Sequence, residues 1–131
     1  RLMRSLFLVT LVVPDYDAAI SWYRDVLGFT LAVDQPLGEG KRWVVMKPDD
    51  TEGAGLLLAR ADGDVETASI GNQTGGRVSF FLNTDDFARD HALYLSRGVE
   101  FIEAPRHEDY GTVAVFRDAF GNFWDLIEHK R

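Results

Sequence analysis

The chain repeats one pattern of residues twice, and this duplication constrains its fold more than any other feature. In the first half, the apolar run 9–13 is followed by an aspartate, a helix-like stretch and Gly28. In the second half, residues 78–82 are followed by the same sequence of features, which ends at Gly98. The two glycines are 70 residues apart, and the runs begin 69 residues apart. A long period that occurs only twice favours two related modules over a solenoid.

Each module is predicted to contain a strand, a helix and three further strands. Asp15 or Asp17 is expected to cap the first helix, and Asp85 or Asp86 the second, because carboxylates accept hydrogen bonds from the free N–H groups there. Strands are expected at residues 6–13, 30–34, 42–47, 55–59, 77–83, 99–103, 111–117 and 123–128. The first run is apolar on both faces, which predicts a strand covered on both sides.

The predicted fold class is α+β, with two βαβββ modules in one domain and mixed sheets that curl around a cleft. The single domain spans residues 1–131, with modules at about 5–60 and 76–129. The glycine-rich stretch 60–76 has no clear hydrophobic period and is interpreted as a connecting loop. The apolar face of the second helix is expected to contain Phe87, Tyr94 and Leu95, with His91 half-buried in the same stripe.

The acidic composition disfavours several classes of partner. The chain has 14 basic and 21 acidic residues, for a net charge of −7. Phosphate backbones and anionic membranes attract basic surfaces, so neither nucleic acid nor a membrane is expected as a partner. Residues 6–13 follow two arginines as in a short signal peptide, but no small-x-small cleavage site follows, and a cytoplasmic location is expected. The absence of cysteine excludes thiolate catalysis and cysteine-ligated metals.

Three segments together resemble a known family. They are VTLVVPDYDAAISWYRDVLGF at 9–29, GRVSFFLNTDDF at 76–87 and GTVAVFRDAFGNFWDLIE at 111–128. In this order and spacing they resemble the vicinal oxygen chelate superfamily, which includes glyoxalase I, bleomycin resistance proteins and extradiol dioxygenases. The resemblance implies two sheets around a ligand cleft that a second copy usually completes, so a homodimer is expected. Ala119 replaces the usual proline of the D-P-x-G-N turn, which affects only the rigidity of that turn.

The resemblance also locates the positions at which metal enzymes of this superfamily bind a divalent ion. By motif, these four positions are Leu8, Leu57, Arg77 and Asp125. Leucine has no donor atom, and arginine stays protonated and repels a cation. Only Asp125 matches a metal ligand, so no metal or other cofactor is expected. The alternative is a rearranged metal site that combines Asp125 with residues 107–109, although a solvated turn is the favoured interpretation of those residues.

The motif positions and several aromatic residues are candidate ligand contacts in the cleft. Arg77 and Asp125 are predicted to pair there and to bind an anionic or carbonyl-bearing ligand, with a structural ion pair at a strand end as the alternative. Aromatic residues such as Tyr110 are candidates for the cleft wall, with the core or a dimer interface as the competing interpretation. The predicted cleft residues are Leu8, Trp43, Leu57, Arg77, Phe81, Phe123 and Asp125.

Three functions follow from these observations. The leading prediction is a glyoxalase- or bleomycin-resistance-like protein that binds a small molecule in a cleft at a dimer interface, without the usual divalent metal. The first alternative is a metal-dependent lyase, isomerase or dioxygenase with a rearranged site. The second alternative is an interaction module that kept the fold and lost the chemistry. The sequence does not identify the ligand.

Overall fold

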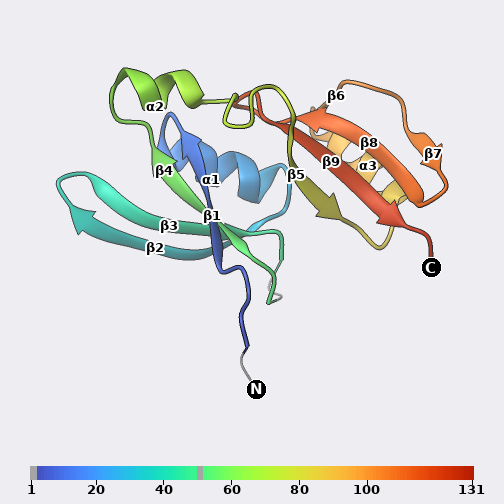
Figure 1. Cartoon of the computed structure of the whole chain (residues 1–131), viewed down its shortest axis with the longest axis horizontal. Coiled ribbons are helices and arrows are strands. Elements are labelled where there is room, and N and C mark those ends of the chain that lie inside the picture. Colours follow the sequence, from blue (N-terminus) through green and yellow to red (C-terminus); the bar gives the residue numbers. More distant parts are fainter. Residues whose placement is uncertain (1–2, 50–51) are drawn as a thin grey trace. The chain divides into compact units, whose positions relative to one another are not determined.

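The computed structural model describes residues 3–49 and 52–131 and divides the chain into two compact units. Unit 1 is Arg1–Ile70 and unit 2 is Gly71–Arg131. Each unit has its own mixed sheet and follows the order strand, helix, strands (Figure 1). The predicted α+β class with two βαβββ modules is therefore confirmed, and the cleft between modules stays a prediction. No helix in the described ranges is long and apolar enough to cross a membrane.

Unit 1 contains a four-stranded sheet in the order β1-β4-β3-β2. Strand β1 pairs in parallel with β4, whereas β3 is antiparallel to both of its neighbours. The elements are β1 (Leu8–Val13), α1 (Tyr16–Asp25), β2 (Thr30–Gly38), β3 (Lys41–Lys47), β4 (Gly55–Arg60) and α2 (Gly63–Ser69). Strand β2 runs four residues beyond its predicted end, because it pairs with β3 almost to the turn of the hairpin.

Helix α1 covers one face of this sheet. It begins as predicted at Asp15, whose carboxylate accepts a hydrogen bond from the N–H of Ala18 at 2.7 Å. After it, Gly28 adopts a left-handed φ of 77°, which ends the helical path. The buried residues of α1 are Tyr16, Ala19, Ile20 and Tyr23, and those of the sheet are Leu11, Val13, Val44, Val45, Met46, Leu56 and Leu58.

The prediction that residues 60–76 form a loop without secondary structure is wrong, because α2 lies within this stretch. Residues 63–69 are helical, and the side chain of Glu66 accepts a hydrogen bond from the N–H of Asp62 at 3.1 Å. None of the residues of α2 is buried. A helix without a buried face has no apolar stripe, so hydrophobic periodicity could not predict it.

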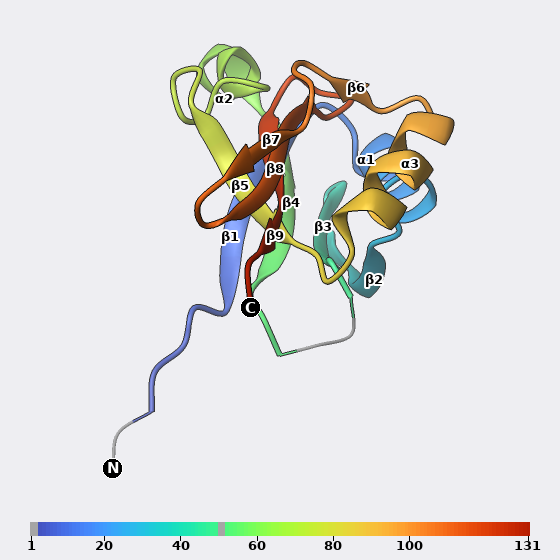
Figure 2. The same cartoon turned by 90° about the vertical axis from the view of Figure 1, so that its right-hand side faces the viewer.

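The first strand is also less covered than its apolar sequence predicts. Strand β1 begins at Leu8, and the preceding Leu6 and Phe7 are 69% and 75% exposed. Figure 2 shows this N-terminal segment leading away from β1. Strand β1 lies at the edge of its sheet, and Val9 and Thr10 are exposed although Leu11 and Val13 are buried on the side of α1. The prediction of a strand covered on both faces is therefore wrong for this chain by itself.

Unit 2 repeats the arrangement with strand order β5-β9-β8-β6, and β7 also pairs with β8. Its elements are β5 (Val78–Asn83), α3 (Phe87–Ser96), β6 (Glu100–Phe101), β7 (Arg106–Glu108), β8 (Gly111–Arg117) and β9 (Phe123–His129). Strand β5 is parallel to β9, and β8 is antiparallel to β9. The strand expected at 99–103 is shorter, and β7 forms where a turn was expected, because residues 106–108 pair with β8.

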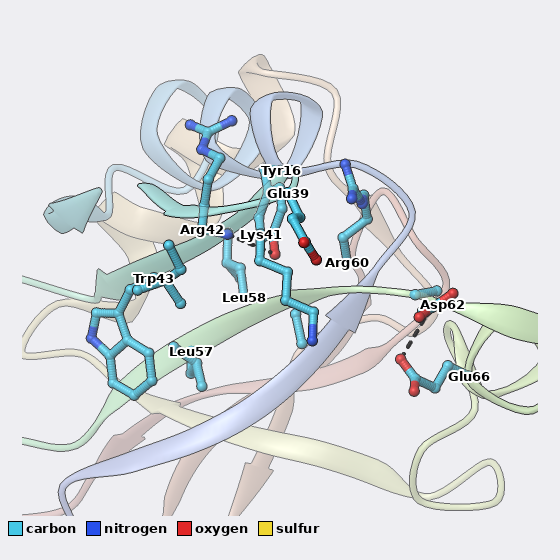
Figure 3. A pocket seen from close by; sticks show the side chains of 13 residues that line it. Tyr16, Glu39, Lys41, Arg42, Trp43, Leu57, Leu58, Arg60, Asp62 and Glu66 are labelled. Carbon is cyan, nitrogen blue, oxygen red and sulfur yellow. Dashed lines mark hydrogen bonds between the residues drawn. The ribbon is translucent and has the colours of Figure 1, made fainter. Parts of the chain in front are cut away.

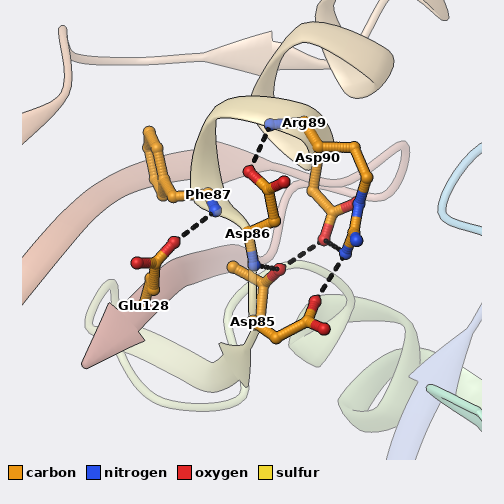
Figure 4. A network of polar contacts seen from close by, with 7 residues as sticks. Asp85, Asp86, Phe87, Arg89, Asp90 and Glu128 are labelled. Carbon is orange, nitrogen blue, oxygen red and sulfur yellow. Dashed lines mark hydrogen bonds and ion pairs between the residues drawn. The ribbon is translucent and has the colours of Figure 1, made fainter. Parts of the chain in front are cut away.

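Helix α3 is held at its start by two carboxylates. The side chain of Asp86 accepts a hydrogen bond from the N–H of Arg89 at 3.0 Å, and Glu128 of β9 accepts one from Phe87 at 2.7 Å (Figure 4). Phe87 and Tyr94 are buried as predicted, but Leu95 is 50% exposed. The ring of His91 is half-buried and packs on Phe87 at a centroid distance of 5.2 Å, which fits its predicted structural place.

The turn between β8 and β9 is organised by one buried carboxylate, Asp118. Its side chain accepts hydrogen bonds from the backbone N–H groups of Phe120 and Asn122 and from the side chains of Asn122 and Trp124. The carboxylate therefore fixes the turn that contains Ala119. The ring of Trp124 stacks on Phe116 at 5.9 Å in the core of unit 2.

Candidate functional site

A pocket of about 590 Å³ opens in unit 1 beside the β2–β3 hairpin, the end of β4 and the start of α2 (Figure 3). Two of the predicted cleft residues, Trp43 and Leu57, line it. Side chains alternate across a strand, and the neighbours Val44 and Leu58 are buried on the side of α1. Trp43 and Leu57 therefore lie on the uncovered face of the sheet, where Trp43 is 36% exposed.

Leu8 lies on the same uncovered face but lines a different pocket, of about 290 Å³. It packs over Gly55, where an added Cβ would lie 3.2 Å from Cδ2 of Leu8 and 2.9 Å from Cγ1 of Val45. A side chain at position 55 would therefore displace these neighbours. The structure thus brings Trp43 and Leu57 into one pocket and places Leu8 in another.

The residues that line the larger pocket also include a cluster around Tyr16, which lies on the face of the sheet that α1 covers, opposite Trp43 and Leu57. The guanidinium carbons of Arg42 and Arg60 lie 5.2 and 5.4 Å from the centre of the Tyr16 ring. The Tyr16 hydroxyl accepts a hydrogen bond from the backbone N–H of Arg42 at 3.2 Å, which fixes the ring. Such cation–π contacts favour a defined position for each guanidinium group.

The two arginines differ in their charge environment. Arg42 donates to Asp34 at 2.7 Å and to Asp17 at 2.9 Å, and these hydrogen bonds raise the pKa of Arg42. The same contact with Arg42 lowers the pKa of Asp34. The side chains of Arg60 and Lys41 form no ion pair with any residue in the described ranges. Arg42 is thus neutralised by carboxylates, whereas Arg60 and Lys41 share the pocket lining with Glu39, Asp62 and Glu66 and form no ion pair with them.

The sequence did not predict this cluster of Tyr16, Arg42 and Arg60. Tyr16 and Arg42 come from elements about 26 residues apart, and Arg60 ends the apolar run GLLLAR. A charged residue at the end of a buried strand was the one available signal, because such a side chain must reach solvent or a pocket. Only the packing of α1 on the sheet brings the three side chains together.

In unit 2, the predicted residues Phe81 and Asp125 are neighbours across strands. Phe81 of β5 and Val115 of β8 both pair in register with Asp125 of β9. Phe81 is 67% exposed, so it presents a large apolar surface on this face. Phe123 lies two residues before Asp125, and the guanidinium carbon of Arg117 lies 5.2 Å from the centre of its ring.

The environment of Asp125 differs from the prediction. Its Oδ1 is covered and has no hydrogen-bond partner in the described part of the chain. Burial raises the pKa of Asp125, the charge of Arg106 lowers it, and the charge of Glu103 raises it. Nε of Arg106 in turn donates to Glu103 at 3.0 Å, and Glu103 accepts the N–H of Val115 at 3.0 Å.

Arg77 does not form the predicted ion pair with Asp125. It lies before β5 and is exposed, and its backbone N–H donates to the carbonyl of Thr74 at 3.4 Å. Within residues 3–49 and 52–131, no ion pair joins it to a carboxylate. Gly75 and Gly76 have left-handed φ values of 67° and 94°, so a turn ends immediately before Arg77. The cation that acts on Asp125 is Arg106, which the motif comparison could not locate.

The side chains at the four motif positions do not fit a divalent metal. Leu8 and Leu57 have apolar side chains, Arg77 carries a positive charge, and Asp125 interacts with Glu103 and Arg106. His107, a candidate for a rearranged site, is exposed, and its Nδ1 lies 3.3 Å from the hydroxyl of Thr112. In the portion of the chain that the structure describes, no three His, Asp or Glu side chains converge in a metal-binding group.

Comparisons with known proteins agree with the fold. The family model described as "Glyoxalase/Bleomycin resistance protein/Dioxygenase superfamily" matches residues 5–126. An uncharacterised protein of Shewanella frigidimarina (strain NCIMB 400) is 49% identical over 126 residues, which cover 95% of this chain and 93% of that protein.

Two solved structures are similar over nearly their whole length. UcmS2 is 28% identical with a TM-score of 0.83, and the match covers 96% of this chain and 98% of that one. TnmS3, an antibiotic binding protein from Streptomyces sp. CB03234, is 26% identical with a TM-score of 0.77 and 98% coverage of both chains. The resemblance inferred from the sequence motifs is therefore confirmed, and the chain belongs to the glyoxalase/bleomycin resistance protein/dioxygenase superfamily.

Proposed function

We propose that this protein binds a small organic molecule in the unit 1 pocket, without the divalent metal of the family's metal enzymes. The observation that carries the proposal is the pocket of about 590 Å³, whose lining includes Trp43 and Leu57 on the uncovered face of the sheet. Its volume lies within the range of about 300–1,000 Å³ for small-molecule sites. Six of the thirteen residues that line it are charged, so the site combines aromatic and apolar side chains with several charged groups.

The composition of the four motif positions supports binding without a metal. Two leucines and an arginine stand where the family's metal enzymes have ligands, and leucine and arginine do not coordinate cations. Asp125 alone provides one carboxylate, whereas a catalytic metal in this type of site needs three or more protein ligands. This donor set favours binding over the alternative of a metal-dependent lyase, isomerase or dioxygenase.

The similarity to TnmS3 supports a small organic molecule as the ligand. That protein is an antibiotic binding protein, and it shares the fold of this chain over 98% of both sequences. We infer that the ligand here is also an organic compound of antibiotic or metabolite size. The alternative of an interaction module predicts a pocket that no small molecule occupies.

We further propose that the protein is a homodimer, and a cytoplasmic location stays a prediction. Leu6 and Phe7 are 69% and 75% exposed next to the edge strand β1, and Phe81 is 67% exposed on the sheet of unit 2. Large apolar side chains that are this exposed favour contact with a second chain. Symmetric dimers are the commonest oligomers of soluble proteins.

A thermal-shift screen of metabolites and antibiotics tests the binding function. A ligand at 100 times its Kd is expected to stabilise the protein by about 2.7 kcal/mol. Its binding should change the fluorescence of the partly exposed Trp43, and Trp43→Phe should remove that change while Trp22→Phe keeps it. A hit whose fluorescence signal survives Trp43→Phe would place the ligand elsewhere. Stoichiometric zinc, nickel, manganese or iron that Asp125→Ala removes would contradict the metal-free part of the proposal.

A further inference from the structure

Strands β3 and β4 stop pairing with each other before either of them ends. Their pairing joins only Val44–Met46 to Leu56–Leu58, although β3 begins at Lys41 and β4 continues to Arg60. Over the same stretch each strand keeps its other neighbour, since β3 pairs with β2 as far as Lys41 and β4 pairs with β1 as far as Arg60. The break in pairing therefore lies inside the sheet, between two pairs of strands that are each intact.

The unit 1 pocket lies at this break. Its lining includes Arg42 and Trp43 of β3 and Ala59 and Arg60 of β4, which are the residues just beyond the paired ones (Figure 3). Alternation along the strands puts the two arginines on the face that α1 covers, and Trp43 and Ala59 on the uncovered face. Paired strands lie only about 5 Å apart. A pocket that receives side chains from both faces therefore needs β3 and β4 to be separated here.

The backbone of Arg42 would be the next partner of Arg60 if the pairing continued. The N–H groups of Gly55 and Ala61 donate to the carbonyls of Phe7 and Val13, so the odd-numbered residues of β4 turn toward β1. The even-numbered residues of β4 therefore turn toward β3, where even-numbered residues lie opposite them in register. Arg42 and Arg60 continue this series by one further pair.

Tyr16 uses the donor that this pair would need. Its hydroxyl accepts the N–H of Arg42 at 3.2 Å, so that N–H is not available to the carbonyl of Arg60. The Tyr16 ring also contacts both guanidinium groups, whose carbons lie 5.2 and 5.4 Å from its centre. Tyr16 is buried and is the first residue of α1, directly after the capping residue Asp15, which fixes its position relative to the sheet.

We propose that the hydroxyl of Tyr16 keeps β3 and β4 apart and thereby holds the unit 1 pocket open. Tyr16 is thus a positioning residue of the ligand site, because it acts through the backbone of Arg42. The inference rests on the proposed function only for the use of the pocket, since the separation of the strands can be measured without a ligand.

Tyr16→Phe tests this, because it keeps the buried ring and removes the acceptor. A partly buried N–H without a partner costs more than like charges opposite each other on neighbouring strands, so the N–H of Arg42 is expected to pair with Arg60. Cα atoms of the adjoining non-hydrogen-bonded pair would then lie about 4.5 Å apart. NMR should therefore show a new nuclear Overhauser contact between the Hα atoms of Trp43 and Ala59.

The equivalent contact between Val45 and Leu57 should be present in the wild type and in Tyr16→Phe, which shows that the sheet is folded in both. Tyr110→Phe is the matched control, because it removes a hydroxyl from an exposed tyrosine of unit 2 and should produce no new contact in unit 1.

A contact between Trp43 and Ala59 in the wild type, or its absence from Tyr16→Phe, would overturn the role of the hydroxyl. Either result leaves the proposed function intact, because the thermal-shift screen tests binding separately. A screen without any ligand would count against the proposed function and leave the expected change in strand pairing unaffected.

Discussion

At the scale of single residues, loss of the buried Asp118 side chain should destabilise the fold strongly. It is 4% exposed, and its carboxylate accepts hydrogen bonds from four donor groups in the turn between β8 and β9. Asp118→Ala should leave those donors unpaired and destabilise the fold by about 3 kcal/mol. Urea denaturation measures this loss. Asp109→Ala, at an exposed turn position, is the control and should change stability by less than about 0.5 kcal/mol.

Asp125 should make stability depend on pH in the direction opposite to most carboxylates. Burial raises the pKa of Asp125, so the folded state retains a proton that the unfolded chain has already released. Its ionisation therefore reduces stability as pH rises from about 4, the unfolded value, through the raised folded value. Asp125→Asn cannot ionise, so its stability relative to wild type should increase across that window and stay higher at neutral pH.

Urea denaturation of both proteins at several pH values measures this difference. NMR titration of the Asp125 carboxyl carbon should also show the raised pKa directly. Because the charge of Arg106 lowers the pKa of Asp125, Arg106→Met should raise it further. An advantage of Asp125→Asn that shrinks with rising pH would contradict the assigned environment.

At the scale of elements, the starts of the helices should contribute unequally to stability. The carboxylate of Asp15 caps α1, whereas Asp62 occupies the equivalent position of α2 without a side-chain capping bond. Asp15→Ala should therefore cost about 1 kcal/mol in the free energy of unfolding, and Asp62→Ala less than about 0.5 kcal/mol. Chemical denaturation of the two variants measures both losses. Equal losses would show that charge, rather than the capping hydrogen bond, stabilises the first turn.

At the scale of the whole molecule, the apolar N-terminal segment should mediate self-association. Light scattering is expected to show a species of twice the 14.7 kDa mass of one chain. The double variant Leu6→Ser, Phe7→Ser should shift this species toward the monomer, because it removes exposed apolar surface beside an edge strand. Val65→Ser is the control, since Val65 is 86% exposed on the separate helix α2. A monomer at micromolar concentration in the wild type would contradict the dimer.

Much of the secondary structure was accessible from the sequence because its signals are local. Asp15 and Asp86 cap helices within three residues of themselves, and Gly28 ends a helix through its own φ. Strand β8 matches its predicted range at Gly111–Arg117, since alternation and glycine position both mark it. Leu57 was expected in the cleft from the family motif and Trp43 as an aromatic candidate for its wall, and in the structure alternation along their strands puts both on the uncovered face.

The remaining features depend on contacts between distant residues. Helix α2 has no buried face, so no periodicity marked it, and the exposure of Leu6 and Phe7 follows from the edge position of β1. The sequence by itself thus determined the duplicated α+β fold and the chemical types at the metal positions. Only the tertiary structure decided that Arg106 acts on Asp125 and that Arg60 stacks on Tyr16, because packing between elements, and not spacing along the chain, brings those charges together.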